Sequence, residues 1–453
     1  TFDFVNWDDP LYVYGNPAIR SLDLSKAMDW ATRPFLDLYV PLPMLSYAVD
    51  YRFYGNDAGG FHATNLWLHG VNVLLVFLIF SRFFRHRGLA FAGAALFAVH
   101  PAQVESIAWI SQRKTLLTAF FALGGFYLWM GKDGDKERHR GSLLGAGILA
   151  VAAFLSKISA GVLPVVFMAH DAFFRKESLA RRSGTYIVLL VIASAGAMAT
   201  VVLYPKAVGS LATASLEAMA LNRLSVWALY LRNAFYPIHL DIFYAVDVFS
   251  GGVMTWIFLA CLVLLLCLYL GTLKRSPAAA FWMSWFLLFL LPVASVLPVP
   301  VGDRHLYLPL AGVIGAVLSL VSRRAMAGTL VVLVLAGLCI PAASARTRVW
   351  RNSETLWNSV HQGTGPFEYK AQMQLASHYE DRGEWRKARA IYKRLMRKYP
   401  NQLPYHYINI YNMEVQRQRT ERMAVIERRF SKKFSKKHDL KEVYATLLRL
   451  KHD

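Results

Sequence analysis

The stretch "LYLPLAGVIGAVLSLVSRRAMAGTLVVLVLAGLCIPAA", residues 306–343, contains only two charged residues, Arg323 and Arg324. Two apolar runs, 305–322 and 326–343, lie on either side of this pair. A helix of about 20 apolar residues is long enough to cross the hydrocarbon core of a bilayer. The stretch therefore predicts two membrane-crossing helices joined by a short turn whose arginines lie at the membrane surface.

The same pattern recurs along most of the chain, in which 55% of the residues are hydrophobic and 17% are charged. A soluble domain cannot bury so large an apolar fraction. The further apolar runs are at about 61–81, 88–100, 113–131, 142–156, 158–174, 184–204, 253–273 and 279–299. Since helices satisfy their own backbone hydrogen bonds in lipid, the runs predict an all-α, polytopic bundle of about ten or eleven spans. The higher number includes a helix that we expect ahead of residue 1.

Basic clusters indicate how the bundle is oriented. Lys and Arg, which are enriched in cytoplasmic loops, gather after alternate apolar runs, at 82–87, 132–140, 175–182, 273–275 and 322–324. The first 60 residues hold eight Asp against four Lys and Arg. We therefore expect a multi-pass protein of a bacterial inner membrane, with a set of loops on the periplasmic side: 1–60, 100–114, 156–157, 205–252 and 300–305.

Two adjacent aspartates stand out in "FVNWDDP", residues 4–10. On their own, Asp8 and Asp9 before a proline are typical of a turn or a helix start. The same periplasmic face is expected to hold further polar residues: His62, His100, Glu105, Arg113, Arg232, Arg304, His305 and Tyr307. Carboxylates beside arginines suit a reaction between an anionic lipid headgroup and a hydroxyl, because a carboxylate accepts a proton and arginine binds phosphate.

Each of these residues also has a structural interpretation. His100 precedes a proline and is as well placed to cap a helix as to contact a substrate. Glu105 and Arg113 lie two helical turns apart and could pair with each other. Arg304 and Tyr307 begin an apolar run, where interfacial anchoring is common. The histidines do not have the spacing of a zinc site, so no metal site is predicted.

Beyond residue 343 the pattern changes to that of soluble amphipathic helices. Residues 375–401 have the small, aromatic and turn positions of one tetratricopeptide repeat, at Ala376, Tyr379, Gly383, Ala388, Tyr392 and Pro400. We therefore predict a membrane domain over 1–343 and a basic repeat-like domain over 344–453 on the periplasmic side. From Arg346 onward there are 24 Lys and Arg against 11 Asp and Glu. This charge favours membrane lipids or an acidic partner, and the periplasmic location argues against nucleic acid; a solvated helix face is the alternative.

Several strings together resemble a known family: "FVNWDDPLYVYGNPAI", "FHATNLWLHGVN", "ALFAVHPAQVESIAWISQRKTLL", "YLRNAFYP", "DRHLYLPLAGV" and "WRNSETLW". They resemble bacterial relatives of the transmembrane-and-tetratricopeptide protein O-mannosyltransferases, which are GT-C glycosyltransferases. The resemblance implies an enzyme that moves a sugar from a polyprenyl-phosphate carrier to an acceptor hydroxyl, with inversion. The repeat domain beside the site favours a protein or peptide acceptor, because the grooves of helical repeats bind extended chains. The chain has His305 where the family pattern has a tyrosine, so no family role is carried over to that position. It has Gln103 where the relatives often have a second histidine, so their acceptor specificity is not carried over, and the sugar is expected to be mannose-like but need not be mannose.

The same resemblance assigns roles to the candidate residues. Asp8 and Asp9 would supply the catalytic carboxylate, and three arginines would hold the donor phosphate: Arg113, Arg304 and Arg232. The remaining candidates would line the donor and acceptor pocket: His100, Glu105, His62, Tyr307 and His305. Such a reaction does not require a metal cofactor, although a carboxylate pair is also a ligand for hard cations.

Other functions remain open at the level of sequence. The acceptor could be a glycolipid or a surface polysaccharide instead of a protein. A membrane-anchored repeat scaffold for envelope assembly would explain the basic repeat domain, but it would not explain the polar residues gathered on one face. A transporter is less favoured because the apolar runs show no internal repeat.

Overall fold

The computed structural model shows helices joined by short turns. It describes residues 2–33, 35, 39–131, 136–203, 216–244, 269–273, 276–293, 301–360 and 366–399, together with 410, 414, 425 and 426. Within these residues no strand forms, so the predicted all-α class is confirmed for the described part of the chain. The chain divides into two compact units, Thr1–Arg351 and Asn352–Asp453.

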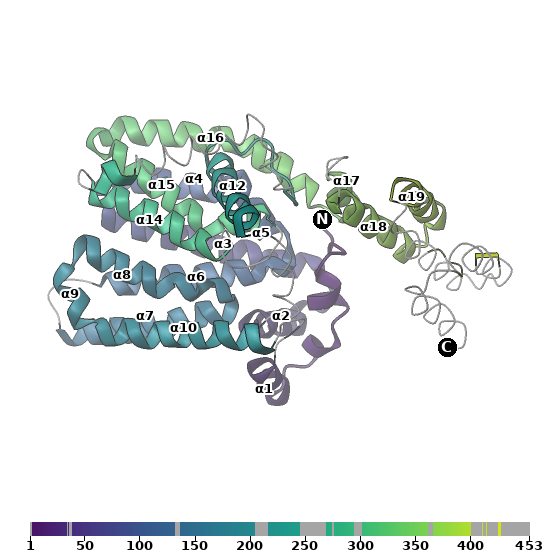
Figure 1. The fold of residues 1–453 in the computed structure, drawn as a ribbon, viewed down its shortest axis with the longest axis horizontal. Coiled ribbons are helices and arrows are strands. Elements are labelled where there is room, and N and C mark those ends of the chain that lie inside the picture. Colours follow the sequence, from purple (N-terminus) through teal and green to yellow (C-terminus); the bar gives the residue numbers. More distant parts are fainter. Residues whose placement is uncertain are drawn as a thin grey trace. The chain divides into compact units, whose positions relative to one another are not determined.

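The first unit is a bundle of helices with short 3-10 and π turns between them (Figure 1). Its helices are α1 (Leu24–Thr32), α2 (Pro41–Tyr54), α3 (Ala58–Phe83), α4 (Arg87–Val99), α5 (Val104–Ala108), α6 (Arg113–Met130), α7 (Lys136–Ser156), α8 (Leu163–Phe174), α9 (Lys176–Arg181), α10 (Ser183–Leu203), α12 (Leu216–Phe235), α14 (Pro277–Leu291), α15 (Tyr307–Val321) and α16 (Ala325–Val349). The main turns are Pro10–Tyr14, Pro17–Arg20, Pro101–Gln103, Ile110–Gln112, Ile158–Val162, Asp303–Leu306 and Ser322–Arg324.

Two helical stretches among the described residues are long and apolar enough to cross a membrane, Ala58–Phe83 and Asp303–Val349. The shorter apolar helices, of 10–17 residues, are Arg87–Val99, Gly141–Ser156, Ile158–Phe174, Ser183–Gly196 and Pro277–Leu291. Parts of two predicted runs, 253–268 and 294–299, lie outside the described residues. A bundle of ten or eleven spans therefore stays a prediction.

The longest apolar stretch leaves most of its surface uncovered by the protein. In the most apolar 18 residues of Asp303–Val349, only 17% of the residues are buried. Leu330 and Leu338 on α16 are 62% and 68% exposed. Exposing apolar surface to water costs about 25 cal/mol per Å², and patches of this kind mark a membrane or partner surface. The exposed face of α16 thus fits an apolar environment better than water.

Glycines set how closely α14 and α15 pack. A Cβ atom on Gly312 would lie 2.6 Å from both the backbone nitrogen of Phe286 and the carbonyl oxygen of Trp282. Trp285, on the same face of α14, donates a hydrogen bond from Nε1 to the carbonyl of Leu308 at 2.9 Å. Backbone atoms of the two helices therefore approach to a distance that only glycine allows. Small residues have this role wherever helices pack tightly in lipid.

Two of the basic segments, 82–87 and 175–182, lie at one end of the bundle. Phe83, at the end of α3, contacts Phe174 at the end of α8 (5.4 Å between ring centroids) and Phe281 near the start of α14 (5.5 Å). Arg82 donates a hydrogen bond to the carbonyl of Tyr127, near the end of α6, at 2.6 Å. Figure 1 shows α9 at this end of the bundle, and α1, α2 and α5 at the opposite end. These two segments follow alternate apolar runs, so their shared end agrees with the expected alternation, while the orientation in a membrane stays a prediction.

The end that carries α9 is held by a buried ion pair. The carboxylate of Asp171 accepts a hydrogen bond from Arg182 at 2.8 Å and one from the Tyr186 hydroxyl at 2.6 Å. The Asp171 and Arg182 side chains are 0% and 3% exposed. Removing one partner of such a pair leaves a buried charge uncompensated. This cluster therefore ties α8 to the start of α10.

The second unit begins with α17 (Ser353–Asn358), α18 (Pro366–Asp381) and α19 (Trp385–Lys398). Gly383 has a φ of +72°, which favours glycine, in the turn between α18 and α19. Ala376 on α18 and Ala388 on α19 are fully buried. The predicted boundary at 343/344 falls inside α16, because that helix continues to Val349. Pro400 and the basic segment 428–437 lie outside the described residues.

We predict that Gly312→Ala destabilises the bundle by about 1–3 kcal/mol, the usual cost of overpacking, because the new methyl group would push α14 and α15 apart. Gly337→Ala on α16 is the matched control, since a Cβ atom there would meet nothing within 4 Å. Thermal unfolding in detergent should show a lower melting temperature for Gly312→Ala alone. Equal melting temperatures for the two variants would contradict this account of the packing.

Candidate functional site

The two adjacent aspartates of the first loop have different surroundings. Asp9 is 1% exposed. It accepts hydrogen bonds from the Val5 amide at 3.0 Å, the Ser111 amide at 3.0 Å and the Ser111 hydroxyl at 2.5 Å. It occupies the N-cap position of the Pro10–Tyr14 turn but makes no side-chain capping bond there. Burial raises the pKa of Asp9 to about 6, although these hydrogen bonds oppose the shift. Asp9 therefore holds the first loop against the Ile110–Gln112 turn.

Asp8 keeps access to solvent, and its side chain is 30% exposed. Its carboxylate lies 3.8 Å from Nζ of Lys114 at the start of α6. The same Nζ lies 4.8 Å from the centre of the Tyr12 ring. Of the two carboxylates, Asp8 is thus the one that is partly open to solvent.

A buried ion pair joins the segment after α4 to the Asp303–Leu306 turn. Nη1 of Arg304 lies 2.6 Å from Oε1 of Glu105, and the Arg304 amide donates to Oε2 at 3.2 Å. The guanidinium lies 5.7 Å from the ring centres of both Trp7 and Trp109. Those two rings stack with 4.1 Å between their centroids. Gly302 leaves room for this arrangement, because a Cβ atom there would overlap the Arg304 guanidinium.

Arg113 is completely buried and has a full set of protein partners. Its guanidinium pairs with Asp50 at 2.6 Å, and it donates to the Asn65 side chain at 2.8 Å and to the Phe61 carbonyl at 2.9 Å. Glu105 and Arg113 therefore do not neutralise each other, because each has a different partner. The contacts of Arg113 tie α6 to α2 and α3, as expected for a structural arginine.

His100 caps the Pro101–Gln103 turn, as one of its two sequence interpretations predicted. Its Nδ1 accepts a hydrogen bond from the Ala102 amide at 3.3 Å. Its Nε2 lies 3.2 Å from the carbonyl oxygen of Ala234, at the end of α12. His100 is 3% exposed, so both ring nitrogens are occupied inside the protein.

Tyr307 and His62 also make contacts inside the protein. The hydroxyl of Tyr307 lies 2.7 Å from Nδ1 of His69 and accepts a hydrogen bond from Asn72 at 3.2 Å. These contacts join the start of α15 to the middle of α3. The ring of His62 packs against that of Phe2, with 5.9 Å between centroids. The structure thus places these two candidates in helix and loop packing.

Arg232 belongs to a network that the sequence did not indicate. It donates two hydrogen bonds to the side chain of Asn233, which itself donates to Asp303 at 3.2 Å. The hydroxyl of Tyr244 donates to Asp303 at 2.6 Å, and Nη2 of Arg346 lies 3.3 Å from the same carboxylate. Asp303 therefore connects the region after α12 to the end of α16.

A polar cleft lies beside the Arg304–Glu105 pair. Its lining includes Arg304, His305 and Lys157. Lys157 was not singled out from the sequence, where its only signal is one cation between two apolar runs. In the structure its Nζ donates to the hydroxyl of Thr115 at 3.1 Å. The predicted phosphate ligand Arg304 and the predicted pocket residue His305 thus line the same cleft as Lys157.

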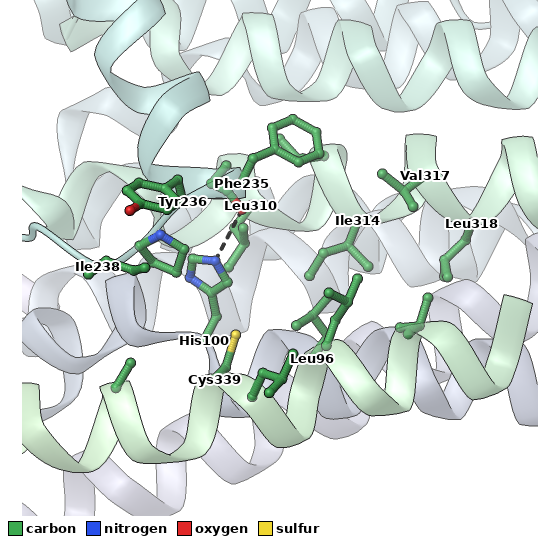
Figure 2. A pocket seen from close by; sticks show the side chains of 17 residues that line it. Leu96, His100, Phe235, Tyr236, Ile238, Leu310, Ile314, Val317, Leu318 and Cys339 are labelled. Atoms are coloured by element: carbon green, nitrogen blue, oxygen red, sulfur yellow. Dashed lines mark hydrogen bonds between the residues drawn. The ribbon is translucent and has the colours of Figure 1, made fainter.

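An apolar groove of about 320 Å³ lies at the end of α12, between α4, α15 and α16. Figure 2 shows His100 pointing from its wall toward the backbone beneath Phe235, with Cys339 nearby. Leu96, Ile314, Val317 and Leu318 continue the wall toward the other end of the bundle. Its lining suits a hydrocarbon chain.

We predict that Asp9 makes stability depend on pH between about 4 and 6. Its pKa is about 6 in the folded protein and 3.8 is its ordinary value, so its contribution to stability is fully present below about pH 4 and is lost as pH rises through 6. A pKa difference of about two units corresponds to a change of about 3 kcal/mol in the free energy of unfolding. Unfolding of wild type and Asp9→Asn should be compared at steps from pH 4 to 7. If the free energies of unfolding of wild type and Asp9→Asn differ by the same amount at every pH in this range, the pH dependence does not come from Asp9.

Comparison with known proteins finds partial relatives. The chain is 35% identical over 120 residues to the protein O-mannosyl-transferase Tmtc1 of Drosophila melanogaster, which is 26% of this chain and 14% of that protein. It is 38% identical over 89 residues to protein O-mannosyl-transferase TMTC1 of Mus musculus, or 19% of this chain and 9% of that protein. For TMTC4 of Mus musculus the identity is 34% over 118 residues, or 22% and 16%.

No family model matches the chain, and neither does any solved structure. The matched segments cover about a fifth to a quarter of the chain and less than a fifth of each of these relatives. The chain is therefore similar, over part of its length, to protein O-mannosyl-transferases.

Proposed function

We propose that the protein is a membrane glycosyltransferase that moves a sugar from a polyprenyl-phosphate carrier to an acceptor hydroxyl. The observation that carries this proposal is the position of Asp8, whose partly exposed carboxylate lies 3.8 Å from Lys114. Trp7, the residue before Asp8, stacks on Trp109, and the Arg304 guanidinium lies 5.7 Å from both of their rings. A proton acceptor and a phosphate-binding cation thus flank one aromatic surface. The partial similarity to protein O-mannosyl-transferases supports sugar transfer as the reaction.

In the proposed reaction the acceptor oxygen attacks the anomeric carbon of the sugar. The acceptor O–H proton passes to the carboxylate of Asp8 as the new carbon–oxygen bond forms. The bond between the anomeric carbon and the phosphate oxygen breaks, and its electron pair stays on the lipid phosphate. One displacement from the opposite face inverts the anomeric configuration. Arg304 stabilises the leaving phosphate, and no metal is needed for this charge balance.

The geometry divides the remaining candidates into two groups. Arg304 and His305 line the cleft and are assigned to the donor. Arg113 and His100 are buried with protein partners and do not line the cleft, so we assign them to the support of the site. Tyr307 lines the cleft, but its hydroxyl contacts His69 and Asn72, so it is assigned to support as well. Asp9 is likewise assigned to positioning Asp8, because its own carboxylate is taken up by Val5 and Ser111.

We place the reaction at the periplasmic side of a bacterial inner membrane. The basic segment 175–182, which contains α9, lies at the opposite end of the bundle from α1, α2 and α5, which supports this orientation. The apolar faces of α3 and α16 and the groove beside His100 support a lipid environment. The acceptor is a protein or peptide, because a second helical unit follows the bundle and helical repeats bind extended chains.

We predict that Asp8→Asn lowers transfer at least about 100-fold, the contribution of a general base. The melting temperature should be unchanged, because the Asp8 side chain is partly exposed. Asp29→Asn is the matched control: Asp29 also lies in the first loop, and it is exposed on α1. The assay uses purified protein, radiolabelled polyprenyl-phosphate sugars and a pool of envelope proteins and glycolipids.

The outcomes separate the alternatives. Label on a protein band in wild type and Asp29→Asn, but not in Asp8→Asn, supports the proposal. Label that reaches only glycolipid or polysaccharide keeps the enzyme and replaces its acceptor. Transfer by Asp8→Asn at the wild-type rate would remove the assigned base. Absence of transfer from every carrier, with no carrier binding, would favour a scaffold.

A further inference from the structure

The cleft beside Arg304 has a polar and an apolar wall. It is narrow, with a volume of about 30 Å³. The polar wall consists of Thr115, Thr118, Lys157, Ser159, Arg304, His305 and Tyr307. The apolar wall consists of Ala160, Phe289, Val293, Leu308 and Pro309. Among the described residues that line the cleft, none is acidic.

Lys157 is a third cation near the cleft, in addition to Lys114 and Arg304, and it has no described carboxylate partner of its own. The carboxylate of Asp8 lies beside Lys114, and that of Glu105 pairs with Arg304. In the described part of the chain no carboxylate lies within ion-pair distance of Nζ of Lys157, whose hydrogen bond goes to a neutral hydroxyl. Burial and the positive charges of Lys114 and Arg304 lower the pKa of Lys157 to about 7.

A largely buried ammonium group without a counter-ion is costly, because water no longer solvates it. A bound anion at the mouth of the cleft would remove this cost. Hydroxyls and an ammonium are hydrogen-bond donors for several oxygens at once, as a phosphate group requires. The apolar wall beside them suits the first carbons of a lipid attached to that phosphate.

We propose that Lys157, with the hydroxyl of Ser159, binds the phosphate of the lipid-linked donor in this cleft. Thr115, whose own hydroxyl donates to Gln112, positions the Lys157 ammonium by accepting its hydrogen bond. This assignment rests on the proposed function, and it adds a cation that neither the motifs nor their spacing identified. Lys157 takes the role that the sequence suggested for Arg113, whose guanidinium already has Asp50, Asn65 and the Phe61 carbonyl as partners. Because both the donor and the departing lipid phosphate carry this group, Lys157 contacts the ligand before and after transfer.

The test measures binding to the full chain in detergent, with three probes. These are an unlabelled polyprenyl phosphate, the corresponding polyprenol without phosphate, and inorganic phosphate. Wild type should be stabilised against heat by the polyprenyl phosphate and much less by the other two, since the cleft contacts both the phosphate and the lipid. Stabilisation by inorganic phosphate at the same concentration as the lipid phosphate would identify free phosphate as the ligand and overturn the assignment to the donor.

Two variants separate binding from folding. Lys157→Gln should weaken binding of the polyprenyl phosphate at least tenfold, and Lys157→Arg should retain most of the affinity. Without probe, Lys157→Gln should melt at the same temperature as wild type or higher, because it removes an uncompensated cation. Lys26→Gln, outside the cleft and partly exposed, is the control. A purely structural lysine would show the opposite pattern, with a lower melting temperature in Lys157→Gln and unchanged affinity.

The outcome is separable from that of the proposed function. If Asp8→Asn abolishes transfer while Lys157→Gln binds the polyprenyl phosphate as wild type does, the cleft assignment is wrong and the enzyme stands. If Lys157→Gln loses binding but no sugar is transferred by wild type from any carrier, the lipid-phosphate site stands and the transferase does not.

Discussion

The hydrogen bonds of Asp9 hold the candidate site together. This carboxylate joins two segments that lie 102 residues apart in the chain, the first loop and the turn before α6. With Asp9 buried against Val5 and Ser111, the preceding residue is held at the edge of the bundle with its carboxylate toward solvent. The position of Trp7 on Trp109 follows from the same contact. The proposed role of Asp8 as a base requires such support, because loops are otherwise the mobile part of a fold.

Buried charge organises the rest of this end of the bundle. Arg113 with Asp50, Arg304 with Glu105 and Arg346 with Asp303 are three ion pairs, each formed between different segments. In each pair the two opposite charges compensate each other, so neither is buried alone. Each pair also restricts where the two segments that it joins can lie. Both of the last two pairs involve the Asp303–Leu306 turn. Arg304 joins this turn to the segment after α4, and Asp303 joins it to the end of α16. Lys157 differs from these residues, since its described partner is a neutral hydroxyl.

The opposite end of the bundle has a simpler construction. Phe83, Phe174 and Phe281 pack where α3 and α8 end and α14 begins, and Asp171 with Arg182 closes the connection to α10. Between the two ends, Gly312 allows α14 and α15 to touch along their backbones. The bundle thus provides a rigid support on which polar groups collect at one end. This division suits a protein whose chemistry takes place at a membrane surface, with apolar helices below it.

Local patterns in the sequence determined the helical class and the shared end of the basic segments 82–87 and 175–182. Apolar runs set where helices form, and clusters such as 175–182 showed which ends belong together, because both properties depend on neighbouring residues. Single residues could not be assigned in this way. The two aspartates are adjacent and chemically identical, yet Asp9 is buried and Asp8 is not. Only the tertiary structure decided that difference, the pairing of Glu105 with Arg304 instead of Arg113, and the presence of Lys157 in the cleft, because charges choose partners by distance in space.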